Sequence, residues 1–414
     1  MMGAGVLRVA PLPGETTWSL LCRIATRYAM APGDLLPGWQ WANARPQGPG
    51  GATRPDAEVL LNRAGQRALV RLSRTGEDSF AGALPSWPDG PGAFAETADD
   101  DRLLARWQVA STALGPVAFG CRLCTARRTG QASPVMRYLP RWARVCGRHQ
   151  RWLLDAADGH ELEHLDLADC PQVWAAQRRW AGVARRAAQA GADPERVFAM
   201  ARAVVCQWWE QALSWDQETV WPTRLHHVAG GDAGPRFWWW RAVARDAVTF
   251  PEVVAVARAL TDPAVQEQVW DDHGGRGPVR AFRPDGAFGC ELAARLGRPW
   301  MTELPADYSG ALGAWMGAVV RGRFRAEHGI TPTGWPDDPW FLKKEHRPAP
   351  VAVQLRNLDE HAERAARQAS AAQVRAGRAG DAAFTRVAYV DRRGRRAVAY
   401  YRRPAPADAA RGQG

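Results

Sequence analysis

Apolar side chains recur every three or four residues along much of the sequence, a spacing that predicts amphipathic helices with one buried face. Thr16 or Thr17 can cap the first of these helices, whose apolar positions run from Trp18 to Tyr28. Further helical patterns cover residues 59–72, 171–190, 194–213, 250–260 and 358–376. Residues 386–401 instead alternate between apolar and polar around Asp391-Arg392-Arg393-Gly394, which predicts a β-hairpin.

Two segments have the helix, turn and new helix start of a helix-turn-helix element. In the first, the helix after Thr16 is followed by Met30-Ala31-Pro32-Gly33-Asp34-Leu35-Leu36. The second spans residues 289–300, where Gly297 separates a helical pattern from a restart at Pro299-Trp300. Helical hairpins that never contact DNA have the same pattern, so these segments alone leave DNA recognition open.

Composition and charge favour a folded, basic protein. The chain has 414 residues, a hydrophobic share of 46% and 21 Trp, which suits several packed domains rather than a disordered chain. Its net charge of +11 favours a polyanionic partner such as nucleic acid. Lysine occurs only at Lys343 and Lys344, a bias toward arginine that phosphate recognition and a high-GC coding preference would both produce.

The cysteines and the apolar runs indicate the compartment. The chain has seven Cys with one close C-x2-C pair, and it starts without the pattern of a secretory signal peptide. The longest apolar stretches, such as Phe237-Trp238-Trp239-Trp240, are too short to cross a bilayer. We therefore expect a cytoplasmic, nucleoid-associated protein with no membrane partner.

The strongest chemical signal is formed by two close pairs of metal-binding residues. Cys121 and Cys124 form a C-x2-C motif, and after 21 further residues Cys146 and His149 form a C-x2-H motif. Zinc prefers four thiolate or imidazole ligands in a tetrahedron, and a two-residue gap lets a tight turn present both members of a pair to one ion. Protein ligands would fill all four positions, so we predict a structural Zn²⁺ site. The alternative is that the cysteines are buried apolar residues and His149 a surface residue.

A second metal site has weaker support. His160, His164 and Cys170 follow the first pattern closely, but no fourth ligand lies at a suitable spacing. Asp169-Cys170-Pro171 is also typical of a helix start. The sequence therefore predicts one zinc site.

Several arginines are candidates for contacts with DNA phosphates, because a guanidinium that neutralises a phosphate releases condensed counterions. They lie off the apolar face of the first helix, around the metal motif and at the tip of the predicted hairpin. They are Arg23, Arg27, Arg127, Arg128, Arg141, Arg144, Arg392, Arg393, Arg395 and Arg396. The alternative is that they are solvated, and at the hairpin a basic edge also discourages strand aggregation.

Three segments together carry a family resemblance. In residues 11–25 a proline and an acidic residue precede a Ser-containing helix that ends Arg23-Ile24-Ala25. The metal pattern has Trp142 just ahead of Cys146, and Leu153-Leu154 just after His149. Residues 169–179 are similar to an actinobacterial branch of isolated TniQ-domain proteins. These features resemble the TniQ/TnsD family of transposition target-selection proteins, over about the first 180 residues.

The resemblance implies a helix-turn-helix and zinc-finger protein. Such a protein would recognise double-stranded DNA or a target-bound complex and recruit an AAA+ ATPase, which in turn engages the transposase. Some relatives bind a fixed DNA site themselves, and others act with an RNA-guided complex. Relatives with two complete zinc fingers differ from this chain, which has ligands for one.

No motif predicts an active site. Neither lysine follows a phosphate-binding glycine run, and the carboxylates of Asp99, Asp100 and Asp101 would point in different directions on a helix. Cys22 and Cys206 lie in apolar helical patterns typical of a core. The tryptophans at 208–209 and 238–240 fit core packing better than base stacking.

These observations predict a mainly α, multi-helix fold with helix-turn-helix-like elements, an inserted structural zinc finger and a small C-terminal β-hairpin. We expect an N-terminal helical region at 1–115, a zinc module at 116–170, a helical region at 171–350, and a helix, basic hairpin and tail at 351–414.

The favoured hypothesis for function is a non-enzymatic, DNA-associated adaptor that selects target DNA and recruits a transposition ATPase. One alternative is a stand-alone DNA-binding regulator or replicon-end factor outside transposition. Another is an enzyme that acts on nucleic acid.

Overall fold

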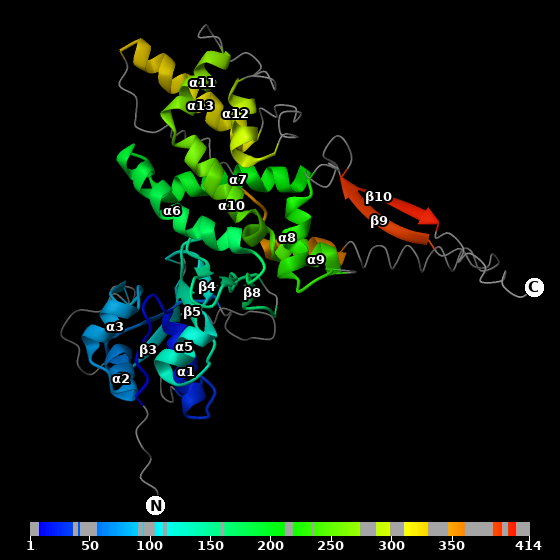
Figure 1. Cartoon of the computed structure of the whole chain (residues 1–414). Coiled ribbons are helices and arrows are strands. Elements are labelled where there is room, and N and C mark those ends of the chain that lie inside the picture. The colour runs from blue at the N-terminus through cyan, green and yellow to red at the C-terminus, as the bar shows by residue number, and fades with distance from the viewer. Residues whose placement is uncertain are drawn as a thin grey trace, which may run out of the picture. The chain divides into compact units, whose positions relative to one another are not determined.

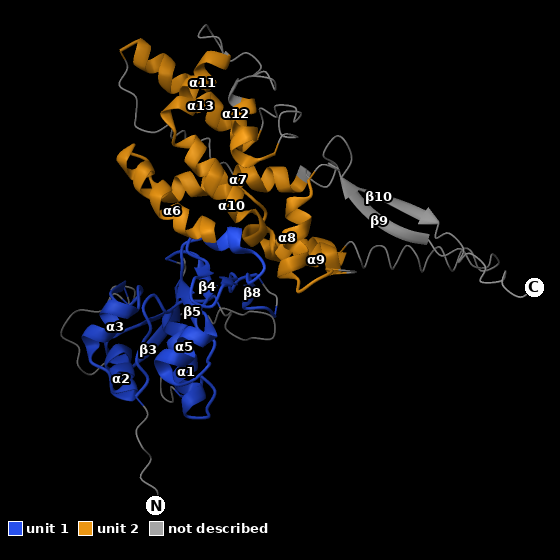
Figure 2. Ribbon diagram, in the orientation of Figure 1, with its two compact units in different colours: residues 1–174 blue, residues 175–414 orange. Residues whose placement is uncertain are grey.

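The computed structural model describes residues 8–35, 40–41, 56–89, 94, 104–110, 114–158, 161–211, 218–233, 236–273, 287–298, 310–329, 347–360, 384–390 and 396–402. The chain divides into two compact units, residues 1–174 and 175–414, coloured separately in Figure 2. The regions expected at 1–115 and 116–170 both fall in the first unit. Those expected at 171–350 and 351–414 fall in the second, apart from the start of its first helix.

The first half of unit 1 is a small three-stranded sheet with helices around it (Figure 1). Its elements are α1 Thr17–Arg27, β1 Gln40–Trp41, β2 Val59–Leu61, α2 Arg63–Ser73, α3 Glu77–Ala83 and β3 Arg106–Val109. β3 lies in the middle, antiparallel to β2 and parallel to β1. A buried core includes Leu20, Leu21 and Ile24 of α1 with Phe80 and Trp87. The helix predicted over residues 59–72 is wrong at its start, because residues 59–61 form β2 and the helix begins at Arg63; the sheet was not predicted.

Helix α1 begins where the sequence predicts. The Thr16 side chain accepts a hydrogen bond from the Ser19 N–H at 3.1 Å, which satisfies one free amide of the first turn. After α1, residues 32–35 form the expected turn, but no helix begins up to Leu35. Leu36 and the residues up to 39 lie outside the described part of the chain, so a first helix-turn-helix element is not confirmed.

The second half of unit 1 consists of short strands and one helix. Its elements are β4 Val117–Phe119, α5 Arg122–Thr129, β5 Met136–Tyr138, β6 Val145–Cys146, β7 Arg151–Leu153 and β8 His164–Asp166. β4 pairs with β5, and β7 pairs with both β6 and β8, all antiparallel. Val117, Met136 and Ala156 form a very small apolar cluster here. Trp152, Leu154 and Leu165 are also buried in this segment.

Unit 2 is helical apart from a terminal hairpin. Its elements are α6 Pro171–Gln189, α7 Pro194–Gln211, α8 Val220–Val228, α9 Phe237–Val243, α10 Arg245–Leu260, α11 Pro263–His273, α12 Ala287–Leu296, α13 Ala311–Glu327, β9 Phe384–Val390 and β10 Arg396–Arg402. α7 and α10 pack along each other, and Phe198 and Phe250 meet with ring centroids 6.1 Å apart. Trp221 and Trp315 are fully buried, so the tryptophans of this unit largely build its core.

The C-terminal predictions are confirmed in part. β9 and β10 pair antiparallel with Val390 opposite Arg396, as the alternation predicted. Residues 351–360 are helical, and residues 361–376 of the predicted helix lie outside the described residues. α12 ends at Gly297, whose φ of +62° suits glycine, but residues 299–309 lie outside the described part. A second helix-turn-helix element is therefore not confirmed either.

None of the helices described is both long enough and apolar enough to cross a lipid bilayer.

Candidate metal centre

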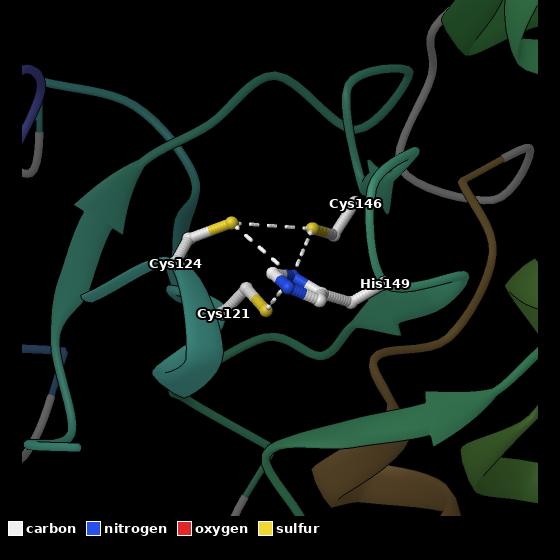
Figure 3. A group of neighbouring side chains, drawn as sticks. All are labelled: Cys121, Cys124, Cys146 and His149. Carbon is white, nitrogen blue, oxygen red and sulfur yellow. Dashed lines mark hydrogen bonds between the residues drawn. The ribbon is translucent and has the colours of Figure 1, made fainter. Parts of the chain in front are cut away.

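The four predicted ligands converge on one point. Figure 3 shows the sulfurs of Cys121, Cys124 and Cys146 around the imidazole of His149. His149 Nδ1 lies 3.3 Å from the sulfurs of Cys121 and Cys124 and 3.6 Å from that of Cys146. The sulfurs of Cys124 and Cys146 are 3.6 Å apart. In a tetrahedral zinc site with ordinary bond lengths, sulfur–sulfur and sulfur–nitrogen separations are roughly 3.8 and 3.6 Å. The cluster can therefore hold one tetrahedral metal ion.

The first ligand pair lies at the start of helix α5. Cys121 is the N-cap residue and Cys124 follows within the first turn, so the helix backbone fixes their separation. The Thr125 N–H donates to the Cys121 carbonyl at 3.0 Å, which closes that turn. At a helix start the unpaired amide groups favour negative charge, which suits a pair of thiolates.

The second ligand pair lies on a hairpin turn. β6 and β7 pair Cys146 with Arg151, and the loop between them carries His149. The His149 N–H donates to the Cys146 carbonyl at 3.2 Å, and Gln150 takes a left-handed φ of +49°. A side chain at Gly147 would place its Cβ 3.3 Å from Trp174 Nε1, a tight contact that favours glycine at this position. The two-residue gap therefore forms the tight turn that the sequence predicted.

The electrostatics of the cluster favour a bound cation. Burial would raise the pKa of the Cys121 thiol, but hydrogen bonds led by the backbone N–H of Cys124 lower it overall. Burial, assisted by the neighbouring sulfurs of Cys124 and Cys121, raises the pKa of Cys146 to about 12. Three thiolates this close repel one another without a positive ion between them. A divalent cation removes that repulsion, and its binding displaces the thiol protons.

Two ion-pair groups hold the surrounding strands. Arg122 next to Cys121 donates to both carboxylate oxygens of Glu163, with Nε to Oε2 at 2.6 Å. Asp155 accepts from Arg141 Nη1 at 2.7 Å and also from Arg144. Sequence reasoning missed both carboxylates, because neither Asp155 nor Glu163 lies at a fixed spacing from its arginine partner.

Two arginines predicted to contact DNA are instead buried within the fold. Arg23 is 6% exposed and donates to Glu15 through Nε at 2.7 Å and Nη2 at 2.6 Å. Arg144 is 2% exposed and pairs with Asp155. The structure therefore buries both guanidiniums in ion pairs and does not present them at the surface, where a phosphate would bind.

The other predicted arginines differ in availability. Arg127 and Arg128 are exposed at the end of α5, Arg27 is half-buried, and Arg141 keeps 41% of its side chain exposed beside Asp155. Arg392, Arg393 and Arg395 lie outside the described residues. Arg396 is described only as the first residue of β10.

The opening motif of the chain is a buried polar network that reaches the metal-bearing half of unit 1. Glu15 is fully buried, and besides Arg23 it accepts from the Ser19 hydroxyl at 3.0 Å and the Leu12 N–H at 2.9 Å. The Ser19 hydroxyl in turn accepts from the Met136 N–H of β5 at 3.0 Å, and the Thr16 N–H donates to the Met136 carbonyl at 3.0 Å. The carboxylate, hydroxyl and guanidinium groups of the motif therefore form one hydrogen-bonded network, which also binds the backbone of β5.

Other candidate residues fall where the sequence placed them. Cys170 is 1% exposed, and the cluster at residues 121–149 is the one group of potential metal ligands among the described residues. His160 and the run Asp99 to Asp101 lie outside those residues. Cys206, Trp208 and Trp209 are buried in α7, which confirms them as core.

Comparison of the chain with protein-family models, with curated proteins and with solved structures finds no match.

Proposed function

We propose that this protein is a non-enzymatic, DNA-associated adaptor of the TniQ type, which selects target DNA and recruits an AAA+ transposition ATPase. The observation that carries the proposal is the coupling of two motifs that resemble the family. The opening motif around Glu15 and the Cys/His cluster belong to separate stretches of sequence, yet Ser19 and Thr16 hydrogen bond to Met136 between the two ligand pairs. An adaptor needs such a rigid module to present surfaces to two partners.

The metal in this proposal is zinc in a structural role. Three sulfurs and one imidazole nitrogen are a ligand set that zinc prefers. Structural zinc supplies roughly 10–16 kcal/mol of apparent binding energy in small zinc-finger peptides. With every coordination position filled by protein, the ion has no open position for a substrate.

Metal analysis of the purified chain tests this role. We expect one equivalent of zinc per chain, and Cys146→Ser should lose the metal and lower the melting temperature. Cys290→Ser, which changes an exposed cysteine outside the cluster, is the matched control. It should keep the bound zinc and the melting temperature of the parent. A Cys146→Ser protein that folds and melts like its parent would contradict a structural metal.

The adaptor role is tested by recovery of partners from the native host. The tagged protein is purified after nuclease treatment, so that proteins held only through DNA are lost. We expect an AAA+ ATPase to be recovered with the parent and not with Cys146→Ser. Binding to duplex DNA without any ATPase would instead favour the stand-alone DNA-binding regulator.

A further inference from the structure

Helix α6 carries a face made of four exposed arginines around one glycine. We call this set the arginine face: Arg178, Arg179, Gly182, Arg185 and Arg186. All four arginine side chains are exposed. The opposite side of the helix is buried through Val173, Ala176, Trp180, Val183 and Ala187. The core contacts of α6 therefore direct the arginine face outward.

The four arginines surround Gly182 in a regular pattern. They stand three and four residues before it and three and four residues after it, which are the positions that adjoin a residue on a helix surface. A Cβ added at Gly182 would meet no atom within 4 Å, so no contact inside the chain requires glycine there. Glycine within a helix is destabilising relative to alanine. The arginine face therefore has a glycine at its centre that no packing contact within the chain explains.

The charge of this face is not balanced within its own helix. Residues Pro171–Gln189 include no acidic side chain, although acids at i±4 positions are the usual partners of arginines on solvated helices. The charge of Arg186 helps to lower the pKa of Asp262, whose carboxylate also accepts from Arg295 Nη1 at 2.8 Å. The arginine face therefore gathers four exposed guanidiniums on a helix that has no acidic side chain of its own.

We propose that the arginine face of α6 binds the phosphate backbone of duplex DNA. This proposal rests on the DNA-associated function above and names a surface that performs it. From Arg178 to Arg186 the helix rises ~12 Å, so the four arginines occupy a length in which B-DNA carries about seven phosphate charges. Trp180, the one aromatic residue between 175 and 189, is 3% exposed, so the face offers no platform for stacking unpaired bases. Gly182 lets the backbone of the duplex approach the helix closely.

Gly182→Glu is the decisive variant because it should preserve the fold while removing the binding. A glutamate at this position has arginines three and four residues away on both sides, so it forms ion pairs within the helix and improves its helical propensity. We expect an unchanged or higher melting temperature. We expect affinity for a random-sequence duplex, measured by fluorescence anisotropy at about 0.1 M salt, to fall by about tenfold or more.

The matched control is Gly322→Glu in α13. Gly322 is also helical, its added Cβ also meets nothing within 4 Å, and Arg321 and Arg323 flank it. The change of charge is the same, so a general loss of positive charge affects both variants equally. Affinity that falls equally in the two variants, or in neither, would overturn the assignment to α6.

A second measurement reports how many phosphates the arginine face neutralises. Arg178→Gln with Arg185→Gln should flatten the plot of log affinity against log salt by ~0.9 for each phosphate that is no longer neutralised, whereas Arg321→Gln with Arg325→Gln should leave the slope unchanged. Competitor single-stranded DNA or duplex RNA that displaces the probe better than duplex DNA would overturn the choice of partner. If the parent itself fails to bind duplex DNA at low salt, the proposed function fails as well. If the parent binds duplex DNA and Gly182→Glu binds it equally well, only the proposed role of α6 is contradicted.

Discussion

Arg23 and Arg27 lie one turn apart on α1, yet the fold treats them differently. Arg23 is buried against Glu15, which is itself fully buried, whereas Arg27 is only half-buried. A buried ion pair stabilises a fold little more than two apolar residues of similar volume would. Removing one partner, however, leaves the other charge buried and unpaired. The role of an arginine on a helix therefore depends on which acid the tertiary fold brings to it.

We predict that Arg23→Met destabilises the protein by about 3–5 kcal/mol, because the Glu15 carboxylate then stays buried without its ion-pair partner. Arg27→Met on the same helix is the control and should change the free energy of unfolding far less. Urea unfolding of both variants measures the difference. A double variant that also carries Glu15→Gln should recover part of the loss, and equal costs for the two single variants would contradict the buried-pair argument.

Glu58 is a second buried carboxylate, and no arginine among the described residues forms an ion pair with it. Burial raises its pKa, while hydrogen bonds from the backbone N–H groups of Val59 and Thr17 lower it in part. Its Oε1 accepts the N–H groups of Thr17 at 2.9 Å and Val59 at 2.8 Å, whereas Oε2 has no well-formed hydrogen bond. The folded state thus holds the Glu58 proton more tightly than the unfolded chain does.

A raised pKa in the folded state gives stability that is fully present below the unfolded pKa, near 4.5, and is lost as pH rises through the folded value. Glu58→Gln cannot ionise, so it should melt increasingly above its parent as pH increases from about 5 to about 8. Melting temperatures of both proteins across that range test this, since any loss of metal affects both alike. A constant difference between them would show that Glu58 does not titrate in this window.

At the scale of elements, four buried charges connect three helices of unit 2. Glu252 of α10 accepts from Arg224 of α8 at 2.7 Å and from Arg298, just after α12, at 2.9 Å. Arg298 also pairs with Glu218 at 2.7 Å, and Glu218 accepts the Val220 and Trp221 amides at the start of α8. The chain of alternating charges therefore fixes where α8 begins and where α12 ends.

We predict that Glu252→Gln costs about 3–5 kcal/mol of stability, because the buried Arg224 and Arg298 then both lose the Glu252 carboxylate. Glu267→Gln breaks the half-exposed pair with Arg323 and should cost about 0–1 kcal/mol. Chemical denaturation followed by tryptophan fluorescence compares the two, since α8 contains buried Trp221. Similar losses in both variants would mean that burial of the charges is not what matters.

At the scale of the whole molecule, the two compact units have different sources of stability. The metal-bearing half of unit 1 has short strands around a candidate metal centre, while unit 2 has a helical core that includes buried tryptophan and phenylalanine. We predict two calorimetric unfolding transitions, of which a zinc chelator lowers only one. Limited proteolysis with chelator should then cut between residues 115 and 170 first. If the chelator lowers the temperatures of both transitions, or of neither, the metal does not stabilise unit 1 alone.

The metal cluster and the long helices were predictable because their signals are local. A two-residue gap between ligands is closed by one turn, and α6 and α7 each repeat a helical apolar spacing over more than sixteen residues. The helix predicted at 250–260 is α10, which begins five residues earlier, at Arg245. The C-terminal strands were also correct, because their alternation is regular over seven residues each. In these cases the neighbours along the chain decide the structure.

The strands of unit 1 and the roles of its arginines were decided by tertiary structure alone. β1, β2 and β3 have two to four residues each and come from segments far apart, so no periodicity could develop within them. Arg23, Arg127 and Arg144 look alike in the sequence, but only the fold shows which of them meets a buried carboxylate. The sequence determined which residues can bind a metal, because ligand chemistry and spacing are local. Which charges remain available to a partner depends on acids that the fold brings from elsewhere in the chain.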